Sequence, residues 1–333
     1  MRTNKVLFIL LLTSYIGACR FPAIEKPVPT KFGTSSSTST NDISITSTPL
    51  LIPEKPTPTF LPEILANNTK EILEKYVREN GGCRLPCIMG LTLGLSEKPE
   101  VNAFIQYFQQ NAREAENLTD DINIWSYTES SQGGISLRFF EEEKSVSIGL
   151  SYIMGGSNIN RILLGGESYQ YLESGGAKKR FGDPYFTALL SGFSLPSILN
   201  FHGPPSQVLI WPHPNSPGRP SPPAQYTFSF VLVYTEKGFL VQYISERKER
   251  DNYFIGCPTE PYSLDISAWD PKVSLDLIDA VEYFSNVDGV NSQNTSVFKS
   301  LEDASTLNIR EFYDMFKKTD ATECIETPKE LWP

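Results

Sequence analysis

Residues 135–152 decide the fold, and their sequence is ISLRFFEEEKSVSIGLSY. Apolar side chains occupy every second position in two runs, namely Ile135, Leu137, Phe139, Val146, Ile148, Leu150 and Tyr152. Because successive side chains of a β-strand point to opposite faces, this spacing predicts two strands that each bury one face. The acidic run Glu141–Glu143 between them is typical of a solvated turn. With the similar alternation at Ile122 and Ile124, the segment predicts a three-stranded antiparallel meander.

Two helices are predicted before this meander. Asn68 and Thr69 are candidate caps of the first helix, and Gly81-Gly82 ends it. Ser96, with Pro99 and Glu100 behind it, opens the second. The apolar residues recur at helical spacing, at Ile72, Leu73, Tyr76 and Val77 in the first helix and at Val101, Phe104, Ile105 and Phe108 in the second. This spacing places them on one face of each helix, which predicts core packing.

The same order of elements recurs further along the chain. Ser194–Phe201 is predicted as a short helix, and Gln207–Ile210, Tyr226–Tyr234 and Phe239–Ile244 as strands. We therefore expect an α+β fold made of two related helix-plus-meander halves, residues 63–178 and 179–333. The second half ends in a helical tail, with helices over Val273–Phe284 and Ile309–Phe316. The glycine pairs Gly155-Gly156, Gly165-Gly166 and Gly175-Gly176 are predicted as turns at the crossing between the halves.

The N-terminus carries an export signal. Arg2 and Lys5 precede the apolar run Val6–Leu12, which is too short to span a membrane, so residues 1–18 are predicted to be a signal peptide. The tetrad Ile16-Gly17-Ala18-Cys19 resembles the lipobox of bacterial lipoproteins, which implies that Cys19 carries the lipid. An ordinary signal peptide, cut at a small-residue site, is the alternative.

Residues 19–62 follow as a Ser/Thr/Pro-rich segment, which predicts a disordered tether. By resemblance to lipoprotein sorting, Arg20 permits transfer to the outer membrane in a bacterium with two membranes. In a bacterium with one membrane the protein would stay on the cell surface. The expected location is therefore the extracytoplasmic face of the cell membrane or outer membrane.

Composition excludes several classes of function. The 333 residues are 40% hydrophobic, with a formal net charge of −10, which falls to −12 if Arg2 and Lys5 leave with the signal. This sign disfavours a nucleic-acid partner. With two histidines and five cysteines, we expect neither a metal centre nor a cofactor. The short motifs of known enzyme classes are absent, so we predict no catalytic residue.

Four cysteines remain once Cys19 is assigned to lipid, and an even number in an oxidising compartment predicts disulfides. We pair Cys83 with Cys87 and Cys257 with Cys324. The second bridge would clip the tail onto the second half and contribute roughly 4 kcal/mol. A redox pair at Cys83 and Cys87, or zinc held by the four thiolates, is the alternative.

Two resemblances lie on these segments. Residues 83–94, CRLPCIMGLTLG, resemble the C-x-L-P-C-W-W-G-I-T-P-G signature of lipoproteins from Chloroflexi-type bacteria, with Ile88 and Met89 in place of the two tryptophans. That family implies no activity. Gly90–Ser96 and Gly203–Val208 are similar to the G-x-T and L-G-x-P-x-x-V marks of the SmpA/OmlA (BamE) family. That similarity implies a helix-plus-sheet scaffold in envelope assembly.

Together these features predict a non-enzymatic recognition or envelope-assembly module, anchored to the membrane by lipid and able to meet another envelope protein. We expect its binding surface to include the Pro-rich segment Pro212–Pro223, with Trp211, His213 and Trp269 as candidate binding residues. His202 ends a predicted helix, where the helix dipole would favour a charged imidazole. The alternatives are a binder of small molecules or glycans that uses exposed tryptophans, and an envelope hydrolase with a dispersed site.

Overall fold

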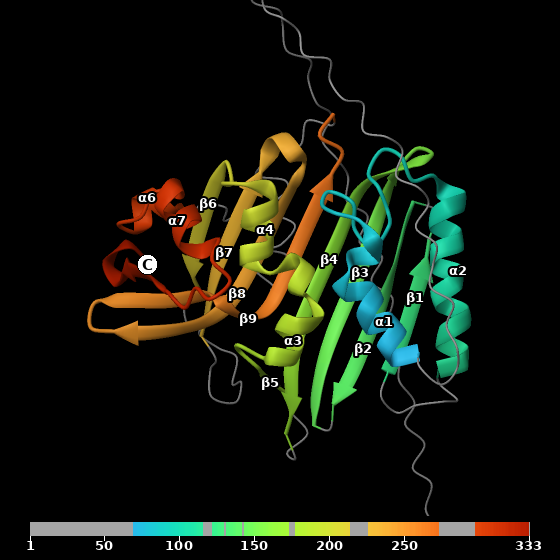
Figure 1. Cartoon of the computed structure of the whole chain (residues 1–333), viewed down its shortest axis with the longest axis horizontal. Coiled ribbons are helices and arrows are strands. Elements are labelled where there is room, and N and C mark those ends of the chain that lie inside the picture. Colours follow the sequence, from blue (N-terminus) through green and yellow to red (C-terminus); the bar gives the residue numbers. More distant parts are fainter. Residues whose placement is uncertain are drawn as a thin grey trace, which may run out of the picture. The chain divides into compact units, whose positions relative to one another are not determined.

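The computed structural model describes residues 69–115, 122–129, 131–141, 143–172, 177–213, 226–272 and 297–332. Within these ranges eleven strands form one sheet (Figure 1). They are β1 (Ile122–Thr128), β2 (Gln132–Glu141), β3 (Lys144–Gly155), β4 (Asn158–Tyr171), β5 (Ala177–Lys179), β6 (Gln207–Pro212), β7 (Thr227–Tyr234), β8 (Phe239–Arg250), β9 (Tyr253–Trp269), β10 (Lys299–Ser300) and β11 (Ile325–Pro328).

The strand order is β1-β2-β3-β4-β9-β8-β7-β6-β10, and each described pairing is antiparallel. The meander predicted from residues 135–152 is confirmed, since Leu137 lies opposite Ile148 in the register of β2 and β3. The pairing of β4 with β9, in which Leu164 lies opposite Ile266, joins the two parts of the chain into one sheet.

The helices described are α1 (Thr69–Arg78), α2 (Lys98–Ala115), α3 (Pro184–Leu189), α4 (Leu195–His202), α6 (Leu301–Ala304) and α7 (Ile309–Phe316). Single 3₁₀ turns lie at η1 (Asn80–Gly82), η2 (Ser191–Phe193), η3 (Thr235–Lys237) and η5 (Lys329–Leu331). Figure 1 shows α1, α3 and α4 in front of one face of the sheet. That face is therefore the covered side of the sheet.

The main core lies between this face and the helices. The sheet contributes Leu137, Val146, Ile148, Leu164, Val241, Tyr243 and Ile266, and the helices contribute Val77, Phe104, Phe186, Leu199, Leu301 and Phe312. All of these side chains are buried. Burial of that much apolar surface, at about 25 cal/mol per Å², is the main term that stabilises the fold.

Local sequence signals explain where several helices begin and end. The Asp183 side chain accepts a hydrogen bond from the Tyr185 backbone N–H at the start of α3. Asn308 and Glu311 form a capping box at the start of α7. Gly203, with φ of 76°, ends α4.

The predicted α+β fold of two related halves is wrong. The described residues form one compact unit whose dominant element is the antiparallel sheet, with helices as its cover. The prediction failed because it treated 63–178 and 179–333 as separate meanders, whereas β4 of the first pairs with β9 of the second over seven residues, from Arg161 to Glu167. The helix-plus-meander order exists along the chain but does not correspond to separate layers.

Two local expectations are also corrected. Gly165 and Gly166 lie inside β4 and not in a turn. A Cβ on Gly166 would meet Leu190 Cδ1 at 2.7 Å, so this glycine permits close packing of the segment after α3 against the strand. β9 is the longest of the described strands and was not predicted, because Pro258 and Pro261 interrupt its alternation.

Both predicted disulfides are formed. Cys257 in β9 bonds to Cys324, with a Cα–Cα distance of 4.2 Å, and Cys83 bonds to Cys87. The first bridge lies beside the pairing of β11 with β9, in which Ile325 lies opposite Gly256. The C-terminal segment is thus held to the sheet by a covalent bond and a short ladder.

Several predicted features lie outside the described residues: the signal peptide 1–18, Cys19, the tether 19–62, the Gly175-Gly176 pair, positions 214–223 of the Pro-rich segment, and the helix Val273–Phe284. Across the ranges that are described, no helix is both long and apolar enough to cross a membrane.

Candidate recognition surface around Arg84

A tightly built loop connects α1 to α2. The Cys83–Cys87 disulfide closes a short ring, and the backbone N–H of Cys87 donates to the Arg84 carbonyl at 2.9 Å within it. After the ring, Ile88 and Leu91 exchange two backbone hydrogen bonds, of 3.0 and 2.9 Å. The loop therefore has a defined backbone conformation although most of it is neither helix nor strand.

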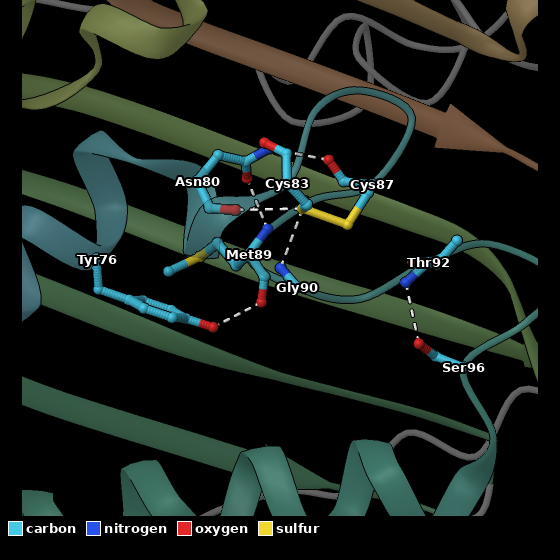
Figure 2. The surroundings of a disulfide bond; sticks show 8 residues. All are labelled: Tyr76, Asn80, Cys83, Cys87, Met89, Gly90, Thr92 and Ser96. Carbon is cyan, nitrogen blue, oxygen red and sulfur yellow. Dashed lines mark hydrogen bonds between the residues drawn. A yellow bond between two sulfur atoms is a disulfide. The ribbon is translucent and has the colours of Figure 1, made fainter. Parts of the chain in front are cut away.

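Asn80 organises this loop from within (Figure 2). Its Nδ2 donates to the carbonyl oxygens of Cys83 and Cys87, each at 3.0 Å, and its Oδ1 accepts from the Met89 backbone N–H at 2.6 Å. The side chain is buried, and the residue has a φ of 52°, which is unfavourable for most residues but tolerated by asparagine. One side chain thus ties both ends of the disulfide ring to the segment that follows it.

Tyr76 and Gly81 fit the loop to helix α1. The Tyr76 hydroxyl donates to the Met89 carbonyl at 2.7 Å (Figure 2), and burial raises the pKa of this phenol. Gly81 lies so close to the Met89 backbone that an added Cβ would be 2.7 Å from the Met89 carbonyl carbon. Ile88 and Met89, which stand where the resembled signature has tryptophans, are buried in the main core. The loop is therefore anchored to the main core by these two apolar side chains.

Arg84 is the charged residue that this ring holds out to solvent. Its guanidinium carbon lies 4.1 Å from the centre of the Phe201 ring, which belongs to α4. Phe201 is 51% exposed, the highest exposure among the large apolar side chains of the described residues. Within the ranges described, Arg84 makes neither a hydrogen bond nor an ion pair with its guanidinium. The stacked pair thus leaves the N–H donors of Arg84 available.

His202 and Lys237 lie beside this pair. The His202 ring packs edge-on against Phe201, at a centroid distance of 4.7 Å, and against Phe239 at 4.8 Å. Lys237 Nζ donates to the His202 carbonyl at the end of α4. Burial, with the positive charges of Lys237 and Arg84, lowers the pKa of His202 to about 4. The imidazole is neutral at pH 7, so the expected charged histidine is wrong; desolvation and two cations outweigh the helix dipole.

These four residues, Arg84, Phe201, His202 and Lys237, are called the Arg84 surface below. It offers two permanent cations and a half-exposed aromatic ring. The cations and the exposed ring suit binding of an anionic group.

The predicted binding residues Trp211 and His213 are brought together on the opposite face of the sheet. Their rings lie 3.6 Å apart between centroids, and Phe298 is 5.4 Å from Trp211. Trp269 lies in the apolar cluster of that face, with Leu209, Val231, Val233 and Leu240. Trp211 is only 7% exposed and Trp269 only 4%. The indoles are therefore packed side chains, and their binding of a ligand stays a prediction.

His213 belongs to a chain of polar side chains. Its Nε2 is 2.7 Å from Ser229 Oγ, which accepts a hydrogen bond from Gln242 Nε2 at 3.0 Å. Burial, with the charges of Lys179 and Arg247, lowers the pKa of His213 to about 3. The neutral ring can accept the Ser229 proton, as in a catalytic dyad. Ser229 is 0% exposed, however, so its hydroxyl cannot reach a substrate.

The missing amides of the Pro-rich segment predict a surface loop with His213 in it, but His213 is only partly exposed. It is half-buried because its carbonyl accepts a hydrogen bond from Arg247 Nη1 and its backbone N–H donates to the Thr227 carbonyl. The Arg247 guanidinium itself lies between the rings of Tyr226 and Phe254, at 4.6 and 4.4 Å. These bonds tie the end of β6 to β7 and β8.

The Arg84 surface was not predicted from the sequence. The sequence predicts a disulfide at residues 83–87 and a helix at Ser194–Phe201, but no local pattern indicates that Arg84 contacts Phe201. An arginine inside a short disulfide ring is the one signal that could have drawn attention to it. Among the described residues, no three His, Cys, Asp or Glu side chains gather in a way that could hold a metal ion.

Comparison with known proteins gives no relative of this chain: no family model, no curated protein and no solved structure matches it.

Proposed function

We propose that this chain is an exported protein, anchored by lipid at Cys19, that recognises another component of the cell envelope without catalysing a reaction. The basic start, the short apolar run and the Ile16–Cys19 tetrad support export and anchoring. The Ser/Thr/Pro-rich tether 19–62 would let the folded unit reach partners away from the membrane.

The Arg84 surface carries the recognition part of the proposal. Its guanidinium is stacked on Phe201 and has no hydrogen-bonded or ion-paired partner in the described chain. A structural arginine is usually paired with a carboxylate or carbonyl, as Arg247 is with Glu249. An arginine that is held in place but left unpaired is suited to meet a group from another molecule.

The experiment is capture from native membranes in mild detergent, through a C-terminal tag on the full chain, with mass spectrometry of the retained proteins and of the N-terminal peptide. Arg84→Gln is compared with Arg78→Gln, since Arg78 is an exposed arginine on α1 that also lacks a described ion pair.

We expect an acylated Cys19 at the N-terminus and a stoichiometric envelope partner that wild type and Arg78→Gln retain and Arg84→Gln loses. A protein that comes down alone, or a partner indifferent to Arg84, contradicts the recognition role. An unmodified Cys19 contradicts the anchor.

A further inference from the structure

The Arg84 surface also limits what its ligand can be. An arginine guanidinium presents N–H donors in a planar fork that matches two oxygens of one carboxylate. Holding such a side chain in one place normally costs conformational entropy when a ligand binds. Here the disulfide ring constrains the Arg84 backbone and the guanidinium lies over the Phe201 ring, so part of that cost is met before binding.

The local charge favours an anion. Two cations lie next to the Phe201–His202 pair: the Arg84 guanidinium carbon is 4.1 Å from the centre of the Phe201 ring, and Lys237 Nζ donates to the His202 carbonyl. The chain as a whole has a net charge of −10, hence this positive surface is set within an acidic protein. An anionic bilayer would meet only two cations here, each worth about 1 kcal/mol at a membrane surface. The rest of the protein would be repelled, so a single anionic group is the better fit.

The exposed ring adds a second requirement. Phe201 is 51% exposed although Arg84 lies over it, so part of the ring remains open to an apolar neighbour of the anion. A carboxylate next to an apolar or aromatic group satisfies both residues at once.

We infer that Arg84 and Phe201 form a subsite for a single carboxylate of a partner protein, with an apolar group beside that carboxylate resting on the Phe201 ring. The inference rests on the proposed recognition function and specifies its partner.

The test uses the full chain as the cell makes it, solubilised in detergent, and follows the arginine side-chain N–H resonances by NMR. The Arg84 resonance is identified by its loss in Arg84→Lys. The probes are phenylacetate, its neutral analogue phenylacetamide, and inorganic phosphate. Phe201→Leu removes the aromatic ring and keeps an apolar side chain.

We expect phenylacetate to shift the Arg84 resonance saturably at millimolar concentration and phenylacetamide to leave it unshifted. The Arg78 resonance should show no saturable shift with either probe. Phe201→Leu should weaken the effect several-fold, because the apolar part of the probe loses the aromatic ring that it contacts. No saturable shift would overturn the inference. Tighter binding of phosphate that ignores Phe201→Leu would overturn it in favour of a phosphate-bearing partner.

Failure of the subsite is distinguishable from failure of the proposed function. If Arg84-dependent capture occurs without phenylacetate binding, the carboxylate chemistry is wrong and the recognition role stands. If phenylacetate binds but no partner is captured, the recognition role is wrong; a carboxylate site exists, but its carboxylate does not come from a captured partner protein.

Discussion

The Arg84 guanidinium carbon lies 4.1 Å from the centre of the Phe201 ring, a contact between a loop and a helix that are far apart in the chain. Neither residue is buried, so the contact does little for the core. A cation over an exposed ring is worth about 0.5 to 1 kcal/mol.

Gly81 and Gly82 test whether the loop depends on close backbone approach. Both have positive φ, 60° and 79°, but only Gly81 has backbone atoms within 3 Å of an added Cβ. Gly82→Ala should cost about 1 kcal/mol, from the backbone conformation alone. Gly81→Ala should cost about 2 kcal/mol more, measured by denaturant unfolding with the disulfides intact. Equal effects would mean that the loop can move away from α1.

Asn80→Ala removes three hydrogen bonds to the loop at a buried position. It should lower the free energy of unfolding by about 2 to 4 kcal/mol, because two carbonyl groups and one N–H lose their partner. Asn200→Ala is the control, since its exposed side chain donates one hydrogen bond, to the Lys317 carbonyl. A loss for Asn80→Ala no larger than that for Asn200→Ala would show that Asn80 does not organise the loop.

The two disulfides should differ in their contribution to stability. The Cys257–Cys324 bridge spans 67 positions and the Cys83–Cys87 bridge spans four. In the loop-entropy model, removing the first by a double Cys→Ser change costs about 4 kcal/mol and removing the second about 2 kcal/mol. Loss of the short bridge should also weaken the Arg84-dependent capture of the partner. Capture that survives its removal unchanged would argue that the ring does not position Arg84.

Acid should destabilise the protein partly through His202. Its pKa is lowered to about 4 in the fold, against about 6.5 in the unfolded chain, so the unfolded state binds the proton first. The stabilisation that neutral His202 contributes is complete above pH 6.5 and is lost as the pH falls from 6.5 through 4. Because the ring is half-exposed, the effect is about 1 to 2 kcal/mol.

The measurement is the free energy of unfolding at pH 7 and pH 4.5 for wild type and His202→Gln. The variant should lose less stability on acidification than wild type does. Identical losses would place the pKa of His202 near its ordinary value. His213, whose pKa is lowered to about 3, stays in both proteins and cancels in the comparison.

Much of the local structure follows from sequence patterns. The alternation at 135–152 and the helical spacing at Ile309–Phe316 each correspond to the observed elements, because one face of each element packs on the core. The even number of cysteines left once Cys19 is set aside predicted disulfides, although counting alone does not decide which cysteines pair.

The arrangement of those elements did not follow, for physical reasons. The pairing of Leu164 with Ile266 depends on contacts between distant segments, which no local period encodes. Gly166 looked like a turn residue, but it is small because Leu190 and Phe186 pack against the strand there. The Arg84 surface was missed for the same reason, since Arg84 and Phe201 meet only in the folded chain.

The most direct test of the account is photo-crosslinking in intact cells from a benzophenone amino acid placed at position 201 of the full chain. Position 253 is the control, because Tyr253 is an aromatic residue of β9 that is 41% exposed and does not belong to the Arg84 surface. We predict a discrete crosslinked envelope protein from position 201 that disappears with Arg84→Gln, and none from position 253. Equal crosslinking from both positions, or none from position 201, would contradict a recognition role for the Arg84 surface.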